Sequence, residues 1–330
     1  MISIFPALPL RGLSARRNNS DHLDEGIEHN AAQRRLSQAL IVAPIIRFDD
    51  TSRLVFFSDL HRGDDGPADA FRHNKEIFLH ALEDYYDRGY TYFEVGDGDE
   101  LWKNGGLESV RRAHAPIYRL LDRFRDAGRL HHLIGNHQLL GAKSTREHQR
   151  QGLLGSEALL LEHSETGQRI LVTHGHQGDG LNARIYGPAR LMVRHFWRRL
   201  QQAGMRTTLP ESQADHSEPN WLKRATAWSH RGQRLIEARI IGWLKRTEGL
   251  AVICGHTHRA AFAQCGEQPY FNCGSGVRPG YITGLEIADG TIRLVTWRDR
   301  PQEGPGAQSL PAGQIYRHVL EGPRLVCDLR

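Results

Sequence analysis

Short apolar runs recur along the chain, and five of them end abruptly in a cluster of polar residues. They cover residues 54–57, 92–95, 130–134, 170–173 and 251–254. Continuous apolar runs of this length are typical of strands that are buried on both faces. Helical patterns over residues 70–88 and 107–127 separate the first three runs. Strands that alternate with helices predict an α/β fold.

The polar clusters share one position, because each directly follows a predicted strand. They are Ser58-Asp59-Leu60-His61, Gly96-Asp97, Gly135-Asn136-His137, His174-Gly175-His176 and Gly255-His256-Thr257-His258. In open α/β sheets, ligands bind outside the carboxyl ends of the strands. We therefore expect the five clusters to converge.

The two flanks and one internal segment differ from this repeat. Residues 1–50 are interpreted as an N-terminal extension with a helix over 27–40, and residues 300–330 as a C-terminal tail. The main domain is predicted over residues 51–299, and it carries an inserted helical cap over about 181–247. The cap segment holds 13 Lys or Arg residues against four acidic residues. Further strands are expected at 270–273, 281–287 and 291–297.

Composition narrows the class of protein only slightly. The net charge of +5 fits an anionic substrate and does not require nucleic acid. The absence of a run of 18 apolar residues predicts no membrane span, and the N-terminal pattern does not indicate a signal peptide. The four cysteines lack CxxC spacing and are interpreted as reduced. We therefore expect a cytoplasmic protein.

The clusters contain the donors that two divalent metals need for phosphoester hydrolysis. Metals about 3.5–4 Å apart activate a water and neutralise charge on the phosphoryl oxygens. Mixed nitrogen and oxygen donors favour Mn, Fe or Zn over Mg. The candidate metal ligands are Asp59, His61, Asp97, Asn136, His174, His256 and His258.

Between residues 53 and 260, these ordered motifs resemble those of the calcineurin-like metallophosphoesterase superfamily. The resemblance implies a four-layer fold, in which a sandwich of two β-sheets is flanked by helices. It implies a metal-bound hydroxide as the nucleophile, and His137 as a general acid. It assigns Asp59, His61 and His258 to the first metal, Asn136, His174 and His256 to the second, and Asp97 as the bridge between them.

The chain also departs from the family pattern. Gln138 stands where the family usually has an acidic residue after the Asn-His pair, so the general-acid step is expected to be tuned differently. The stretch Gly96-Asp97-Gly98-Asp99-Glu100 differs from the motif of protein serine/threonine phosphatases. The following Leu101-Trp102 looks more like the diphosphatases that act on UDP-diacylglucosamine.

Three further residues are predicted to contact the substrate. Arg62 and Arg259 directly follow ligand histidines, so their side chains can reach a phosphate; a surface salt bridge is the alternative for each. His176 is a candidate for contact with substrate or with a ligand. By contrast, His131 and His132 lie inside a strand and are interpreted as structural, and His163 is expected to be solvated.

We therefore expect a metal-dependent hydrolase of a phosphodiester or diphosphate bond in a small or lipid-linked anion. One alternative is a nuclease of the same fold, although nucleic acid is the less favoured partner because no module that binds it is visible. The other is a non-catalytic metal-binding scaffold, one that kept the fold and lost the catalytic metals. The presence of all seven ligands argues against the scaffold.

Overall fold

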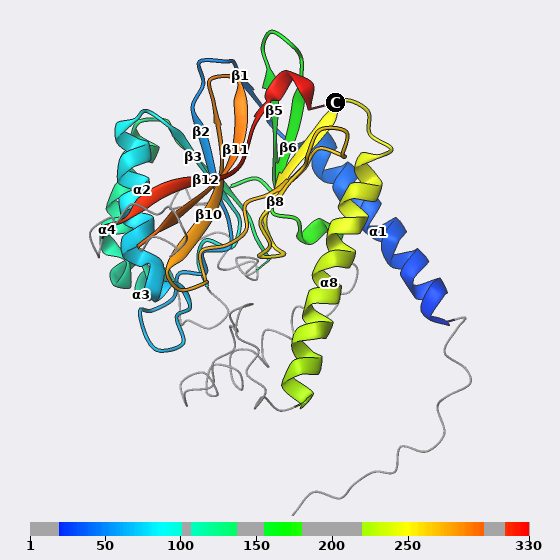
Figure 1. Ribbon diagram of the computed structural model, residues 1–330, viewed down its shortest axis with the longest axis horizontal. Coiled ribbons are helices and arrows are strands. Elements are labelled where there is room, and N and C mark those ends of the chain that lie inside the picture. Colours follow the sequence, from blue (N-terminus) through cyan, green and yellow to red (C-terminus); the bar gives the residue numbers. More distant parts are fainter. Residues whose placement is uncertain (1–19, 101–106, 137–154, 180–219, 300–313, 330) are drawn as a thin grey trace, which may run out of the picture.

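The computed structural model describes residues 20–100, 107–136, 155–179, 220–299 and 314–329. Within this part of the chain, two six-stranded sheets stack face to face, and helices cover both outer faces (Figure 1). The four layers confirm the predicted α/β class and the sandwich of two sheets flanked by helices.

The first sheet, sheet A, contains both parallel and antiparallel neighbours. Its edge strand β1 is parallel to β5, β5 is antiparallel to β6, and β6, β7 and β9 are parallel to one another. The strand order is β1 (Ile45–Phe48), β5 (Ala158–His163), β6 (Arg169–Thr173), β7 (Leu250–Cys254), β9 (Tyr270–Asn272) and β8 (Ala261–Phe262).

The second sheet, sheet B, has a parallel half and an antiparallel half. Strands β2, β3 and β4 are parallel, and β10, β11 and β12 join β2 in antiparallel order. The strand order is β12 (Tyr316–Leu325), β11 (Thr291–Arg298), β10 (Tyr281–Ala288), β2 (Leu54–Phe57), β3 (Thr91–Val95) and β4 (Leu130–Leu133).

The apolar side chains of β2 pack into two different hydrophobic cores. Successive side chains of a strand point to opposite faces. Phe56 packs into the core between the two sheets, where it stacks on Phe93 with the ring centroids 4.8 Å apart. Val55 and Phe57 point the other way, into the core between sheet B and its helices. All four residues of β2 are buried, which explains why its sequence shows no polar alternation.

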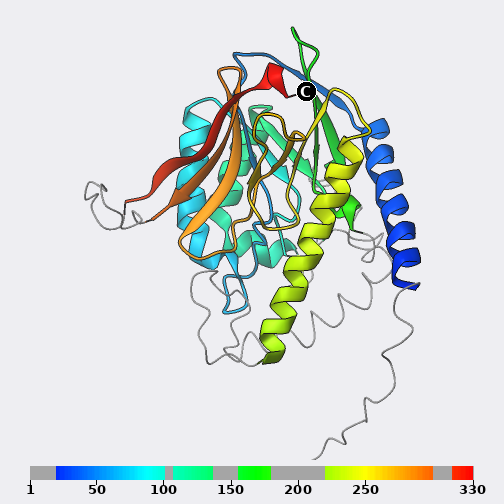
Figure 2. The same ribbon diagram turned by 45° about the vertical axis from the view of Figure 1, so that its right-hand side comes forward.

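Helices complete the two outer layers (Figure 2). Helices α2 (Lys75–Asp87) and α4 (Ala115–Asp126) pack on sheet B, and α1 (Ser20–Val42) and α8 (Asn220–Leu244) pack beside each other on sheet A. In the core under sheet A, Leu36 of α1 meets Ile240 and Trp243 of α8. No described helix is long and apolar enough to cross a membrane.

The predicted helix over 107–127 is interrupted. It forms α3 (Leu107–Ala113) and α4, which are separated at His114. Pro116 stands in the first turn of α4, where its missing N–H is not needed. The predicted helix over 70–88 begins as a short 3₁₀ turn, η1 (Phe71–Asn74), before α2.

Both predicted flanks contribute to the sandwich. The segment interpreted as an N-terminal extension supplies α1 and the edge strand β1. The segment interpreted as a tail supplies the edge strand β12 and a short 3₁₀ turn, η4 (Val326–Asp328). The C-terminal part of the predicted cap is α8, whereas residues 180–219 lie outside the described part of the chain. The domain limits and the cap therefore stay predictions.

His163 was expected to be solvated, and this expectation is wrong. It ends β5, a strand that the sequence pattern did not reveal, and only 2% of its surface is exposed. Because side chains alternate along β5, Glu162 faces outward and His163 inward. There His163 Nε2 lies 3.1 Å from a carboxylate oxygen of Asp50, and its ring meets the ring of Phe48 edge-on.

Candidate metal centre

Donor side chains that follow strands of both sheets meet in two compact groups. In each group, three residues offer one nitrogen or carboxylate oxygen each, and these atoms lie within 4.8 Å of one another. The groups are Asp59, His61 and His258, and Asp97, His174 and His256. Each group draws on both sheets, so the site exists only when the sandwich is assembled.

Backbone strain is concentrated in these residues. In the described chain, seven non-glycine residues have a positive φ, and five of them are predicted ligands. A strained backbone conformation of this kind costs of the order of 1–3 kcal/mol per residue, so the surrounding structure must impose it. The five are Asp59 (φ 53°), His61 (50°), Asp97 (50°), His256 (69°) and His258 (55°).

The two carboxylate oxygens of Asp59 have different surroundings. Oδ2 accepts hydrogen bonds from the Ser58 hydroxyl at 2.6 Å and from the backbone N–H of His256 at 2.7 Å. Oδ1 is buried and accepts no hydrogen bond, although it lies 3.2 Å from Nε2 of His258. Nε2 of His61 lies 3.3 Å from Nε2 of His258. One oxygen therefore fixes the carboxylate, and the other is directed at the imidazoles.

His174 is held in the orientation that a metal ligand needs. Its Nδ1–H donates to the backbone carbonyl of Val95 at 2.9 Å, so the lone pair is left on Nε2. Nε2 lies 3.1 Å from a carboxylate oxygen of Asp97 and 3.1 Å from the side-chain oxygen of Asn136. A hydrogen bond from the second ring nitrogen to a carbonyl is the usual support of a metal-bound histidine.

These contacts fit a bound cation. Around His174, three electron-pair donors converge at hydrogen-bonding distance, and only a shared proton or a metal relieves their repulsion. Around Asp59, the buried Oδ1 has no hydrogen-bond donor, although an unsatisfied buried acceptor is costly. Carboxylate, imidazole and amide donors without thiolate suit Mn, Fe or Zn.

The electrostatics of the site agree with this fit. Burial by itself lowers the pKa of His61, but the carboxylates of Asp59 and Glu100, 3.7 and 3.5 Å from the ring nitrogens, outweigh it and raise this pKa to about 10. Burial also acts against the charged form of His174, yet Asp97 and Asp59 raise its pKa to about 9. The carboxylates therefore create a field that stabilises positive charge.

The structure brings all seven predicted metal ligands together. Asn136 joins the second group through its contact with His174. Asp97 also lies in the second group, and its role as a bridge between two metals stays a prediction. The predicted general acid His137 and its neighbour Gln138 lie outside the described residues.

The placement of Arg62 corrects the prediction that it contacts the substrate. Its side chain is fully buried. Both terminal nitrogens bind the carboxylate of Glu94 at 2.8 Å, and Nε binds Asp99 at 2.8 Å. A guanidinium enclosed in this way has no face open to a substrate, because the side chain turns away from the ligands and under the site.

The other two predicted substrate contacts lie near the metal donors. Arg259 binds Glu237 of α8 at 2.8 Å, and about a third of its side chain is exposed (35%). His176 begins the 3₁₀ turn η2 (His176–Gly178), and its ring centroid lies 5.6 Å from that of His174. Contact of either residue with the substrate stays a prediction.

The sequence reasoning missed two carboxylates at the site. Asp179 is nearly buried, and its oxygen lies 3.7 Å from Nε2 of His256. Glu237 accepts hydrogen bonds from the side chains of Thr257 and Arg259. These two bonds attach α8 to the loop that carries two candidate ligand histidines. Asp179 had a local signal, because it stands five residues after His174. Glu237 had none, because only the tertiary packing brings α8 to this loop.

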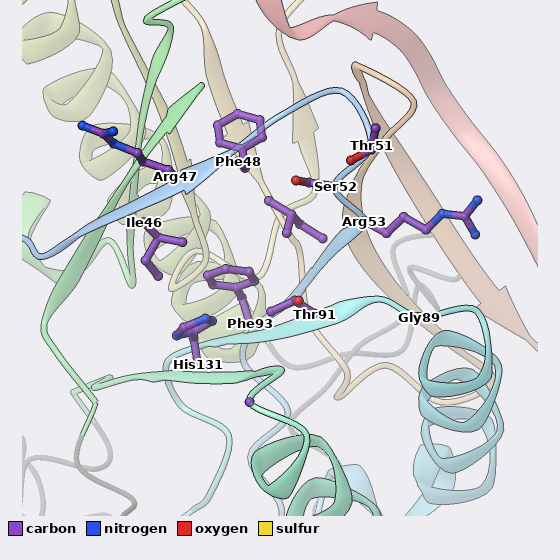
Figure 3. A pocket seen from close by; sticks show the side chains of 12 residues that line it. Ile46, Arg47, Phe48, Thr51, Ser52, Arg53, Gly89, Thr91, Phe93 and His131 are labelled. Carbon is purple, nitrogen blue, oxygen red and sulfur yellow. The ribbon is translucent and has the colours of Figure 1, made fainter. Parts of the chain in front are cut away.

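A cavity of about 410 Å³ lies away from the metal centre (Figure 3). It lies among β1 and the first residues of β2 and β3, at the end of these sheet B strands opposite to the metal ligands. Phe93 and His131 stack beside it with their ring centroids 4.6 Å apart. Figure 3 shows the side chains of Arg47 and Arg53 pointing away to opposite sides. No predicted site residue lines this cavity.

Comparison with protein families gives one match. Residues 52–260, more than half of the chain, match the family described as calcineurin-like phosphoesterase. No curated protein matches the chain.

Solved structures that match this chain have low sequence identity to it. A predicted phosphoesterase from Streptococcus pneumoniae TIGR4 is 13% identical with a TM-score of 0.35, covering 81% of this chain and 97% of its own. Vacuolar protein sorting 29 from Cryptosporidium parvum is 11% identical with a TM-score of 0.37, covering 84% and 100%. An archaeal phosphodiesterase is 13% identical with a TM-score of 0.34, covering 81% and 99%.

Proposed function

The chain belongs to the calcineurin-like phosphoesterase family, and on that premise we propose that it is a two-metal hydrolase of phosphodiester or diphosphate bonds. The observation that carries the proposal is the pair of adjacent donor groups, each built from both sheets. Mn, Fe or Zn suits these donors better than Mg.

The protein's own part in this reaction is to hold the donors in place. Ser58 and the backbone of His256 orient the Asp59 carboxylate. The carbonyl of Val95 fixes the ring of His174. Two divalent cations, when bound, supply positive charge for the phosphoryl oxygens and lower the pKa of a water. Because the donors are already fixed, little reorganisation is required when the substrate binds.

His137 is the proposed source of the proton for the leaving oxygen, since it follows the ligand Asn136 directly in the chain. Gln138 supplies no charge to this imidazole, so the general-acid step is proposed to be tuned differently from that of family members with an acidic residue at this position.

The proposed substrate is a small or lipid-linked anion. The segment 181–247, which the family motifs do not include, holds 13 Lys or Arg against four acidic residues and four tryptophans. Such a composition suits a ligand with a charged group and an apolar or aromatic part.

The four cysteines form no disulfide in the described chain, and this supports the proposal of a cytoplasmic protein.

Hydrolysis of bis(p-nitrophenyl) phosphate in the presence of Mn²⁺ tests the proposal. We expect activity in the wild-type protein and a loss of about 1,000-fold or more in Asp97→Ala and His256→Ala, since removal of a metal ligand costs several kcal/mol of transition-state stabilisation. Asp126→Ala, which removes an exposed carboxylate at the end of α4, serves as the control. Wild-type activity in both ligand variants contradicts the proposal.

A further inference from the structure

Arg62 occupies an unusual position, directly after the ligand His61 and completely buried. Its guanidinium binds Glu94 through two parallel hydrogen bonds and Asp99 through a third. It also lies 5.3 Å from the centre of the Tyr118 ring. This arrangement uses both edges and one face of the guanidinium.

The two carboxylates are fixed in turn by residues of other elements. Tyr92 of β3 donates its hydroxyl to Glu94 at 3.0 Å, and Nδ1 of His132 in β4 lies 3.2 Å from the same carboxylate. Tyr118 of α4 donates its hydroxyl to Asp99 at 2.6 Å. The cluster, which we call the Arg62 network, therefore joins the loops after β2 and β3 to β3, β4 and α4.

The backbone around Arg62 joins the two loops that carry metal donors. Residues 59–62 and 96–100 run side by side as a short parallel ladder. The N–H of His61 donates to the carbonyl of Asp97 at 2.9 Å, and the N–H of Arg62 donates to that of Gly98 at 2.9 Å. The N–H of Glu100 returns a bond to the carbonyl of Arg62 at 2.9 Å. His61 lies with the donors Asp59 and His258, whereas the next side chain, that of Arg62, binds Glu94 and Asp99.

Energetics indicate that the Arg62 network serves geometry more than stability. Moving a guanidinium and two carboxylates out of water is costly, and a buried ion pair is often no more stabilising than apolar side chains of the same volume. Yet the network adjoins the ladder, and each carboxylate accepts hydrogen bonds from both the guanidinium and a tyrosine hydroxyl. The network is also packed tightly against Gly98, because a Cβ at this position would overlap the Glu94 carboxylate.

We propose that Arg62 is a positioning residue for the metal centre. It holds the loop of Asp59 and His61 in register with the loop of Asp97, and so sets the distance between the two donor groups. The proposal rests on the proposed function, because it assumes that the donor groups bind metal. It assigns to Arg62 no contact with metal or substrate.

The test compares Arg62→Met with Arg317→Met. Arg317 of β12 forms the other large Arg–Glu pair of sheet B, with Glu286 of β10, and Tyr85 donates its hydroxyl to that glutamate as well. Neither Arg317 nor Glu286 is near the metal donors. Each substitution therefore removes an Arg–Glu pair of sheet B: the fully buried pair of Arg62 beside the metal centre, or the pair of Arg317, whose side chain is 25% exposed, remote from it.

The measurement is Mn²⁺ binding to the metal-free full-length protein, followed by calorimetric titration, together with thermal unfolding in EDTA. Both variants are expected to unfold at a lower temperature than the wild type. Only Arg62→Met is expected to bind Mn²⁺ more weakly, by about 10- to 100-fold, as is usual when a group that orients metal ligands is removed. Hydrolysis at saturating Mn²⁺ is expected to recover in part.

Two milder variants protect the test against a failure to fold. Arg62→Lys keeps the charge but not the three directed hydrogen bonds, and Glu94→Gln keeps the shape but not the charge. Both are expected to give intermediate Mn²⁺ affinities. Mn²⁺ affinities in the Arg62 and Glu94 variants equal to that of Arg317→Met overturn the positioning role alone. A wild-type protein that binds no metal overturns the proposed function and the positioning role together.

Discussion

At the scale of single residues, the site depends on side chains that hold other side chains. Asp59 directs one oxygen at the imidazoles because Ser58 and a backbone N–H engage the other. His174 presents Nε2 because the carbonyl of Val95 accepts the proton of Nδ1. The candidate metal ligands were visible in the sequence, whereas these orienting partners were found only from distances.

Ser58→Ala tests the orienting role of the serine hydroxyl. The substitution removes one of two hydrogen bonds to Oδ2 of Asp59, so the carboxylate gains rotational freedom. Mn²⁺ affinity is expected to fall by about tenfold. Ser52→Ala, which removes a hydroxyl bound to the carboxylate of Asp49, is the control. Equal Mn²⁺ affinities of the two variants would show that the hydroxyl of Ser58 has no such role.

At the scale of elements, two glycines differ in the space that their surroundings leave for a side chain. Gly98 lies in the loop after β3, where the Glu94 carboxylate and the Arg62 guanidinium leave no room for a Cβ. Gly232 lies in the interior of α8, where nothing would meet a Cβ within 4 Å. Identical substitutions at the two positions therefore have opposite expected effects.

Gly98→Ala is expected to lower the free energy of unfolding by about 1–3 kcal/mol, because the added methyl group forces the buried network apart. Gly232→Ala is expected to raise it by about 0.5–1 kcal/mol, because alanine favours the helix. Urea unfolding of the metal-free proteins measures both changes. A stabilised Gly98→Ala would mean that the loop after β3 leaves room for a methyl group beside the Glu94 carboxylate.

At the scale of the whole molecule, buried ionisable groups join segments that are distant in sequence and make stability depend on pH. Asp69 lies in the loop after the first metal motif and contacts His114 between α3 and α4 at 3.0 Å. Burial raises the pKa of Asp69, but the bond to His114 and the backbone N–H groups of Asp65 and Phe71 outweigh it, and the pKa is lowered. A lowered pKa in the folded state means that the ionised carboxylate favours folding.

The stabilisation by Asp69 is therefore complete above the ordinary carboxyl pKa of 3.8 and is lost as the pH falls through the lower folded value. Asp69→Asn is expected to unfold more easily at pH 7, by about 1–3 kcal/mol, and to lose less stability than the wild type below about pH 4. Chemical unfolding across this range measures the difference. Parallel pH curves for the two proteins would contradict the assignment.

Metal binding couples the two sheets, since each donor group draws on both of them. A cation that binds only the folded protein stabilises it by mass action, by about 2.7 kcal/mol at a free concentration 100 times Kd. The melting temperature is expected to rise with added Mn²⁺ and to fall with EDTA, and Asp97→Ala should abolish the response.

Metal analysis of the purified protein should find about two ions per chain. Fewer than about one would instead favour a scaffold without activity.

The sequence by itself determined the parts of this protein that depend on local pattern. The apolar runs of β2, β3, β6 and β7 predict buried strands because every side chain of such a strand must leave water. The ligand types and their order after those strands indicate two metals because the chemistry of each donor is a property of its own residue. The fold class could therefore be predicted, and so could the seven candidate ligands that the structure brings together.

Only the tertiary structure decided the rest, because it depends on contacts between distant segments. β1 is short and β12 is mixed in pattern, and pairing with a neighbour makes each a strand, as it extends β5 to His163. His163 became buried for the same reason. Arg62 follows a ligand in sequence, yet the ladder between two loops turns its side chain away from that ligand and toward Glu94. Sequence order places residues along the chain, and the packing of the sheets decides which way they face.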